Sequence, residues 1–156
     1  MTPAITLAKQ KKLDYKIHEY THDAAAASYG LEAAEKLGIP STQVFKTLVV
    51  TDDKGKLAVA ILPVNKKLNL KKIAKAIGAK KTNMADPQLV EKNTGYVLGG
   101  VSPLGQKKRL TTVIHTSAKI QKTIYVSAGK RGLEIELPPM QLVEVLSAKF
   151  ADVVQQ

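Results

Sequence analysis

Two adjacent strand-like runs, residues 44–51 and 57–63, constrain the fold of this chain most. Both are rich in β-branched and other apolar residues, and only the polar segment 52–56, which contains Gly55, separates them. A glycine-containing polar loop between two such runs predicts a β-hairpin. The fold must therefore contain a sheet, and the remaining segments have to pack around it.

Helix signals are short and irregularly spaced between further strand-like runs. Thr2 before Pro3, Asn69, and Asp86 before Pro87 are typical helix N-caps. We expect helices over residues 3–12, 31–37, 69–77, 86–93 and 139–146. We expect further strands over residues 15–20, 96–98, 111–115, 123–127 and 133–137. This order excludes a regular βαβ repeat and predicts a mixed α/β fold, one domain over residues 1–156, with a barrel-like sheet and flanking helices.

Positive charge is concentrated in two long segments. The 156 residues carry 24 Lys and Arg against 13 Asp and Glu, and neither segment 54–85 nor segment 92–133 contains an acidic residue. Such segments favour a polyanionic partner, because neutralising phosphates releases counterions. Only two of the cations are Arg and only 4% of residues are aromatic, so backbone contact is favoured over base reading or stacking. A solvated lysine-rich surface is the alternative.

Several kinds of chemistry lack their usual residues. The chain has no Cys, which excludes disulfides, a thiolate nucleophile and Cys-based metal sites. The three His are dispersed without a metal-binding pattern, and no Gly-x-Ser-x-Gly elbow is present. We expect no metal and no cofactor. No apolar run approaches the roughly 20 residues that span a bilayer, so we expect a cytoplasmic protein without a membrane segment.

Lys46 is the most informative single residue. It lies within the apolar run 44–50, where burial of an unpaired ammonium would cost several kcal/mol. A polar pocket or a ligand would explain it, and so would a side chain that reaches water from a strand end. Gly99 and Gly100 indicate a backbone that a ligand can approach closely, although an ordinary turn is the alternative.

Five blocks of the sequence form long, specific motifs. Two of them are Phe45-Lys46-Thr47-Leu48 and Thr94-Gly95-Tyr96-x-x-Gly99-Gly100-x-Ser102-Pro103-Leu104-Gly105-Gln106-Lys107-Lys108-Arg109, and the others are residues 18–23, 84–87 and 123–133. Together these blocks resemble the YbaK/EbsC family of Cys-tRNA(Pro) deacylases, and the resemblance extends over nearly the whole chain.

The resemblance implies a free-standing editing enzyme related to the insertion domain of prolyl-tRNA synthetases. Its substrate would be tRNA(Pro) carrying cysteine by mistake, and possibly Cys-tRNA(Cys). Cysteine is small enough to enter a proline pocket, and about one methylene supplies only roughly 1 to 3 kcal/mol of rejection, so a second sieve is useful. The family's cleavage is described as attack by the substrate's own thiol on its ester. Implied partners are tRNA and prolyl-tRNA synthetase, and nothing requires more than a monomer.

The resemblance also assigns site residues by position. The catalytic residues are Lys46, Tyr20 and Gly99. The substrate-binding residues are Gly100, Val101, Ser102, Pro103, Ser127 and Glu134. The tRNA-binding residues are Lys107, Lys108, Arg109, Lys130 and Arg131. We expect backbone N–H groups between Gly99 and Val101 to bind the oxyanion. Glu134 stands where the family often has Asp, which leaves its role open.

Two alternatives remain at this point. One is editing of other small aminoacyl-tRNAs such as Ala-tRNA(Pro). The other is a non-catalytic adaptor that binds tRNA or the synthetase through charge alone. An editing enzyme requires Lys46, Tyr20 and the segment Gly99–Gly100 to meet in one small pocket, whereas an adaptor does not.

Overall fold

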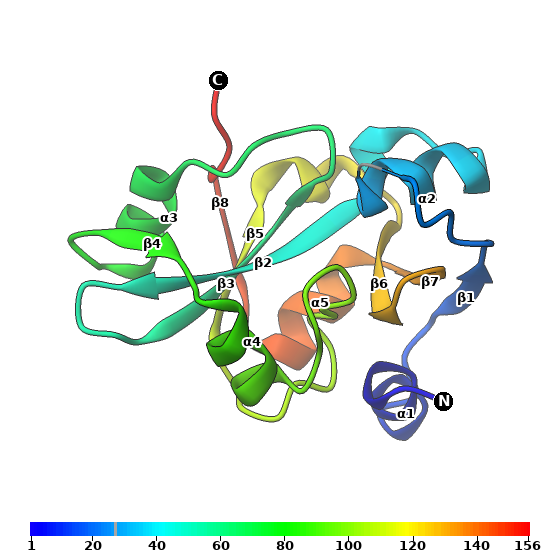
Figure 1. The fold of residues 1–156 in the computed structure, drawn as a ribbon, viewed down its shortest axis with the longest axis horizontal. Coiled ribbons are helices and arrows are strands. Elements are labelled where there is room, and N and C mark those ends of the chain that lie inside the picture. Colours follow the sequence, from blue (N-terminus) through cyan, green and yellow to red (C-terminus); the bar gives the residue numbers. More distant parts are fainter. Residues whose placement is uncertain (27) are drawn as a thin grey trace.

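The computed structural model describes residues 1–26 and 28–156 (Figure 1). The described residues form the α-helices α1 (Pro3–Gln10), α2 (Tyr29–Leu37), α3 (Leu70–Ile77), α4 (Pro87–Thr94) and α5 (Pro139–Leu146). The strands are β1 (Lys16–Glu19), β2 (Phe45–Asp52), β3 (Leu57–Pro63), β4 (Thr82–Met84), β5 (Thr111–His115), β6 (Ile124–Lys130), β7 (Leu133–Leu137) and β8 (Lys149–Ala151). Two short 3-10 helices cover Ser41–Gln43 and Thr116–Ile120.

The strands form two sheets. The larger has the order β4-β2-β3-β5-β8, and the smaller has the order β1-β7-β6. In the larger sheet, the antiparallel β2–β3 pair is the predicted hairpin. Strand β5 pairs in parallel with β3, and β8 pairs in parallel with β5. A single parallel bridge between Val44 and Tyr125 joins the sheets where β2 begins. The mixed α/β fold with flanking helices is confirmed, but the sheets meet at one junction and do not close into a barrel among the described residues.

Strand β2 contributes to two layers of the core because successive side chains point to opposite faces of a strand. Phe45 and Val49 belong to the cluster formed with β6 and β7. Leu48 and Val50 pack instead with Ile73 of α3. Helix α3 begins and ends as its sequence predicts, with the Asn69 side chain accepting a hydrogen bond from the Lys72 amide at 3.0 Å. The Lys46 side chain lies on the α3 side of the strand, closer to its start.

The expected strand over residues 96–98 is wrong. This segment is a turn, and the buried Tyr96 hydroxyl donates a hydrogen bond to the Leu104 carbonyl at 2.6 Å. Tyr96 anchors the loop after α4 to the core, whereas Val97 and Leu98 are exposed. The short strands β4 and β8 were not predicted, because three residues are too few to show a period.

Candidate active site

A cavity of about 280 Å³ lies where the start of β2 meets the β6–β7 hairpin and the first residues of α2. Eight residues that the sequence assigned to a site contribute to its wall: Tyr20, Lys46, Gly99, Val101, Ser127, Lys130, Arg131 and Glu134. These come from five separate parts of the chain. Lys46, Tyr20 and Gly99 therefore share one cavity, although Gly100 does not line it, and the cavity is of a size suited to a small polar ligand.

The Lys46 ammonium has no countercharge of its own. No carboxylate of the described residues forms an ion pair with it. Burial lowers the pKa of Lys46, and the nearby Lys67 lowers it further. A half-buried cation without a partner is costly, so an oxygen atom of a ligand would be a favourable neighbour for it.

Glu134 and Ser127 form a polar corner of the cavity, opposite each other on β7 and β6. The Glu134 side chain is only 7% exposed, and burial raises the pKa of its carboxyl to about 8. Glu134 is thus mostly protonated at neutral pH and able to donate a hydrogen bond. The Ser127 hydroxyl accepts the Gly129 amide at 3.1 Å, at the bulge that interrupts the β6–β7 pairing.

Gly99 is constrained by a cation–π pair that no sequence motif revealed. The Arg131 guanidinium lies 3.5 Å from the centre of the Tyr29 ring. Gly99 has φ 89°, and a Cβ there would lie 2.7 Å from both Arg131 Nε and Tyr29 Cε2. Glycine at this position therefore leaves room for the stacked pair as well as for a ligand.

The backbone donors near Gly99 are fewer than expected. The Gly100 amide donates to the Val97 carbonyl at 3.0 Å and is not free for an oxyanion. Gly100 also packs against the Lys130 backbone, where a Cβ would lie 3.1 Å from the Lys130 Cα. Within residues 1–26 and 28–156, the amides of Gly99 and Val101 have no intramolecular acceptor. Only these two amides fit the predicted role.

A buried carboxylate fixes the segment that carries Tyr20. Glu32 of α2 accepts hydrogen bonds from His22 Nδ1 and from the Asp23 amide, each at 2.7 Å, and pairs with Lys36. Burial alone would raise the pKa of Glu32, but these hydrogen bonds lower it to about 2. The Tyr20 hydroxyl lies 3.5 Å from the Tyr29 carbonyl oxygen. Burial raises the pKa of Tyr20, and the nearby Glu134 raises it further.

Three residues assigned to substrate binding do not line this cavity: Gly100, whose amide is already bonded to Val97, and the neighbouring Ser102 and Pro103. Ser102 is fully buried, and its hydroxyl accepts the Leu104 amide at 3.2 Å. Pro103 contributes to a different hollow, described next. The hydrogen bond of Ser102 holds the shape of the loop after α4.

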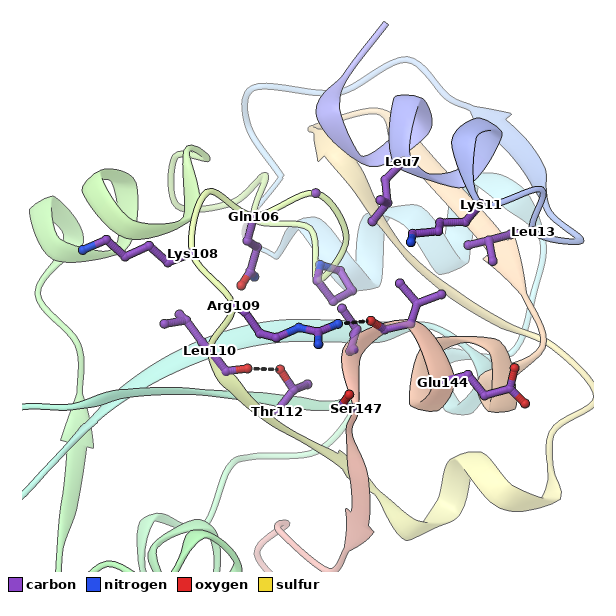
Figure 2. A pocket seen from close by; sticks show the side chains of 14 residues that line it. Leu7, Lys11, Leu13, Gln106, Lys108, Arg109, Leu110, Thr112, Glu144 and Ser147 are labelled. Carbon is purple, nitrogen blue, oxygen red and sulfur yellow. Dashed lines mark hydrogen bonds between the residues drawn. The ribbon is translucent and has the colours of Figure 1, made fainter.

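Figure 2 shows that second hollow, of about 530 Å³, between α1, α5 and the loop before β5. Lys108 and Arg109, both assigned to tRNA, line it, and one Arg109 amino group donates to the Val145 carbonyl at 2.6 Å. The Lys107 stem packs against Gly95. The five cations expected to bind tRNA thus separate into two groups, of which only Lys130 and Arg131 lie at the Lys46 cavity.

The described residues offer no evident metal site or membrane span. No group of three or more His, Cys, Asp or Glu among them could hold a metal ion. None of the helices built from these residues has the length and apolar character needed to cross a membrane.

Comparison with known proteins assigns the chain to a family. The aminoacyl-tRNA editing domain matches residues 23–145, which contain every wall residue named above except Tyr20. The chain belongs to this family. Its resemblance to YbaK/EbsC proteins is thereby confirmed, and its general activity is aminoacyl-tRNA editing.

Individual relatives agree with this assignment. An Enterococcus faecalis protein, EbsC, provisionally described as a Cys-tRNA(Pro)/Cys-tRNA(Cys) deacylase, is 40% identical over 97% of this chain and 92% of its own. A proline–tRNA ligase of Acidithiobacillus ferrooxidans is 39% identical over 46% of this chain and 12% of the ligase. A crystal structure provisionally described as a trans-editing enzyme for prolyl-tRNA synthetase has the same fold, with a TM-score of 0.84, 22% identity and coverage of 99% and 96%.

Replacing Gly99 should destabilise the protein in two ways, through strain at a positive φ and through overpacking, and a control variant can separate them. We expect Gly99→Ala to lower the free energy of unfolding by about 1 kcal/mol more than Gly78→Ala, because the new methyl group overpacks the Tyr29–Arg131 pair. Gly78 also has positive φ, at 76°, but open space around its Cβ position. Urea denaturation of both variants measures the difference, and equal losses would contradict the packing argument.

The buried Glu134 predicts a pH-dependent stability. The pKa of Glu134 in the folded protein is about 8, above its ordinary value of 4.5. Its contribution to the free energy of unfolding is therefore complete below pH 4.5 and is lost as the pH rises to about 8. We expect Glu134→Gln to abolish this loss, measured as the free energy of unfolding from pH 4 to 9. Glu136→Gln is the control on the same strand, because hydrogen bonds from Thr123 and His18 lower the pKa of Glu136 against the effect of burial. If the free energy of unfolding of Glu134→Gln fell with pH as steeply as that of the unmodified protein, Glu134 would not be the source of the pH dependence.

Proposed function

We propose that this protein is a trans-acting deacylase that removes cysteine from Cys-tRNA(Pro). The observation that carries the proposal is the unpaired Lys46 ammonium in a small cavity shared with Tyr20, Gly99 and Glu134. Membership of the editing family supports the reaction class, and the description of EbsC supports cysteine as the amino acid. Because that description also names Cys-tRNA(Cys), the same chemistry on that tRNA is a second candidate.

The reaction we propose needs no nucleophile from the protein. The thiol of the bound cysteinyl group attacks its own ester carbonyl. A carbon–sulfur bond forms, the carbon–oxygen bond to the ribose breaks, and the thiol proton is transferred to the ribose oxygen. The products are a cyclic thiolactone and free tRNA. The chain contains no Cys, so the only sulfur nucleophile available in the cavity is that of the substrate.

The task of the cavity is then to hold the cysteinyl group in attack geometry and to stabilise negative charge. Intramolecular attack gains from correct orientation, for which a narrow cavity is sufficient. Donors directed at the developing oxyanion give the largest electrostatic contribution in such reactions. We assign that contribution to the Lys46 ammonium and to the amides of Gly99 and Val101. Protonated Glu134 and the Ser127 hydroxyl would fix the polar groups of the amino acid.

Two exposed cations on the cavity wall are suited to the tRNA end. These are Lys130 and Arg131, and stacking on Tyr29 holds Arg131 in place. An arginine fixed in this way is ready to pair with phosphate oxygens. We expect the protein to act as a cytoplasmic monomer alongside prolyl-tRNA synthetase, without metal or cofactor.

Loss of Lys46 should abolish most of the activity. We expect Lys46→Ala to reduce the single-turnover rate for Cys-tRNA(Pro) by roughly 10²- to 10³-fold, as for removal of one oxyanion donor. Lys66→Ala is the matched control, since Lys66 is exposed and does not line the cavity. Equal rates in the two variants would rule out the role given to Lys46.

The same assay separates the alternatives. A non-catalytic adaptor would bind tRNA in a salt-sensitive manner without releasing the amino acid. Equally rapid cleavage of Ala-tRNA(Pro), which has no thiol, would instead indicate attack by water and a broader substrate range.

A further inference from the structure

The cavity reaches the face of the larger sheet that α3 covers, because Lys46 and Leu48 line it from this side of β2 while Phe45 lines it from the other side. Lys46, Leu48 and Val50 point to that face of β2, and Ile73 of α3 covers the last two. Strand β2 then continues to its pairing with β4, where Thr51 lies opposite Asn83. Strand β2 thus runs from the cavity, near α2, toward β4 and α3, and the course of the strand can be followed in Figure 1.

Lysines line this course. A hollow of about 590 Å³ between α3 and β4 is bordered by Lys71, Lys75, Lys80 and Lys81. Lys67 lies between this hollow and the cavity in sequence, and it acts electrostatically on Lys46. We call the five residues Lys67, Lys71, Lys75, Lys80 and Lys81 the lysine track. No member of the track forms an ion pair with a described residue, whereas the neighbouring Lys72 pairs with Asp152 at 2.8 Å.

The position of Lys71 is not explained by the stability of α3. The first turn of a helix favours acidic side chains, because the helix dipole is positive there. The first turn of α3 contains no acidic residue, and Lys71 and Lys72 occupy it. Asp152 compensates Lys72, but Lys71 has no such partner. An anion from outside the protein would relieve this repulsion.

We propose that the lysine track binds the phosphate backbone of the tRNA acceptor stem while the aminoacylated 3′ end occupies the Lys46 cavity. This rests on the proposed function. The five steps along β2 from Lys46 to Thr51 span about 17 Å at about 3.3 Å per residue, and a duplex presents one phosphate per roughly 1.7 Å of its axis. The track is thus long enough to contact several phosphates. Lysines act as point charges, so they position a backbone without reading its sequence.

Salt-dependent binding tests the track without any catalysis. The probe is an acceptor-stem minihelix that ends in CCA and carries no amino acid. Its binding is measured by fluorescence anisotropy. The variant Lys71→Gln with Lys75→Gln should raise the Kd at least roughly fivefold at 50 mM salt and reduce the slope of log K against log salt by about 2. The control is Lys9→Gln with Lys16→Gln, which removes the same charge from α1 and β1. Lys9 occupies the last turn of α1 as Lys75 does that of α3.

The expected result is a loss confined to the track variant, and the control should match the unmodified protein. A Kd and a slope in the track variant equal to those of the unmodified protein would overturn the proposal, because the track would then contribute nothing to binding. So would an equal loss in both, which would indicate a general charge effect.

Turnover distinguishes this proposal from the proposed function. The ratio of kcat/KM for Cys-tRNA(Pro) to that for a cysteinyl-CCA trinucleotide should fall in the track variant and stay constant in the control. Absence of turnover on both substrates by the unmodified protein would contradict the deacylase activity, while the minihelix titration would still decide the track. A normal ratio in the track variant of an active enzyme would contradict the track alone.

Discussion

The organisation of this protein centres on the Lys46 ammonium group, which is partly withdrawn from water and forms no ion pair with any residue that the structure describes. Strand β2 has to run through the core to join the two sheets, and Lys46 stands near its start, where the strand crosses the junction. Burial and the nearby Lys67 both disfavour the charged form there. A chain selected only for stability would place an apolar residue at such a point. The surrounding structure is understandable if a ligand completes the environment of Lys46.

The walls of the cavity are held by contacts that lie behind them. Glu32 connects α2 to the segment that carries His22, and the Tyr29 ring packs edge-on against the same imidazole. Tyr29 in turn stacks on Arg131, and both fill the space beside Gly99. Three segments distant in sequence are thereby fixed with respect to one another. A cavity that aligns its substrate for intramolecular attack depends on such rigidity, because small displacements of the reacting groups reduce the rate strongly.

Much of the fold could be predicted from local signals. The hairpin around Gly55 and the cap at Asn69 depend on residues close in sequence, and both appear as expected. The strand predicted over residues 96–98 failed because the buried hydroxyl of Tyr96 bonds to Leu104 across a loop, and alternation alone cannot reveal that contact. Strand β4 is too short for any period to show.

The site was predictable in its members but not in its geometry. The family resemblance placed Lys46 and Glu134 in one site, and the structure brings them to one cavity. It could not show that the Gly100 amide is already bonded to Val97, or that Arg109 lies in a separate hollow. Tyr29 was missed because its role arises from stacking on Arg131, a contact across the fold that leaves no pattern in the sequence.

The central claim is that the substrate supplies the attacking sulfur while the protein supplies shape and hydrogen-bond donors. Single-turnover cleavage of S-methylcysteinyl-tRNA(Pro), compared with Cys-tRNA(Pro), tests it most directly. Methylation blocks the thiol and adds only one methyl group, and binding of the two substrates can be matched by saturating the enzyme. Intramolecular attack predicts release of cysteine as a thiolactone from the native substrate and no enzymatic acceleration for the methylated one. Cleavage of both substrates at the same rate would show that water or a protein group is the nucleophile.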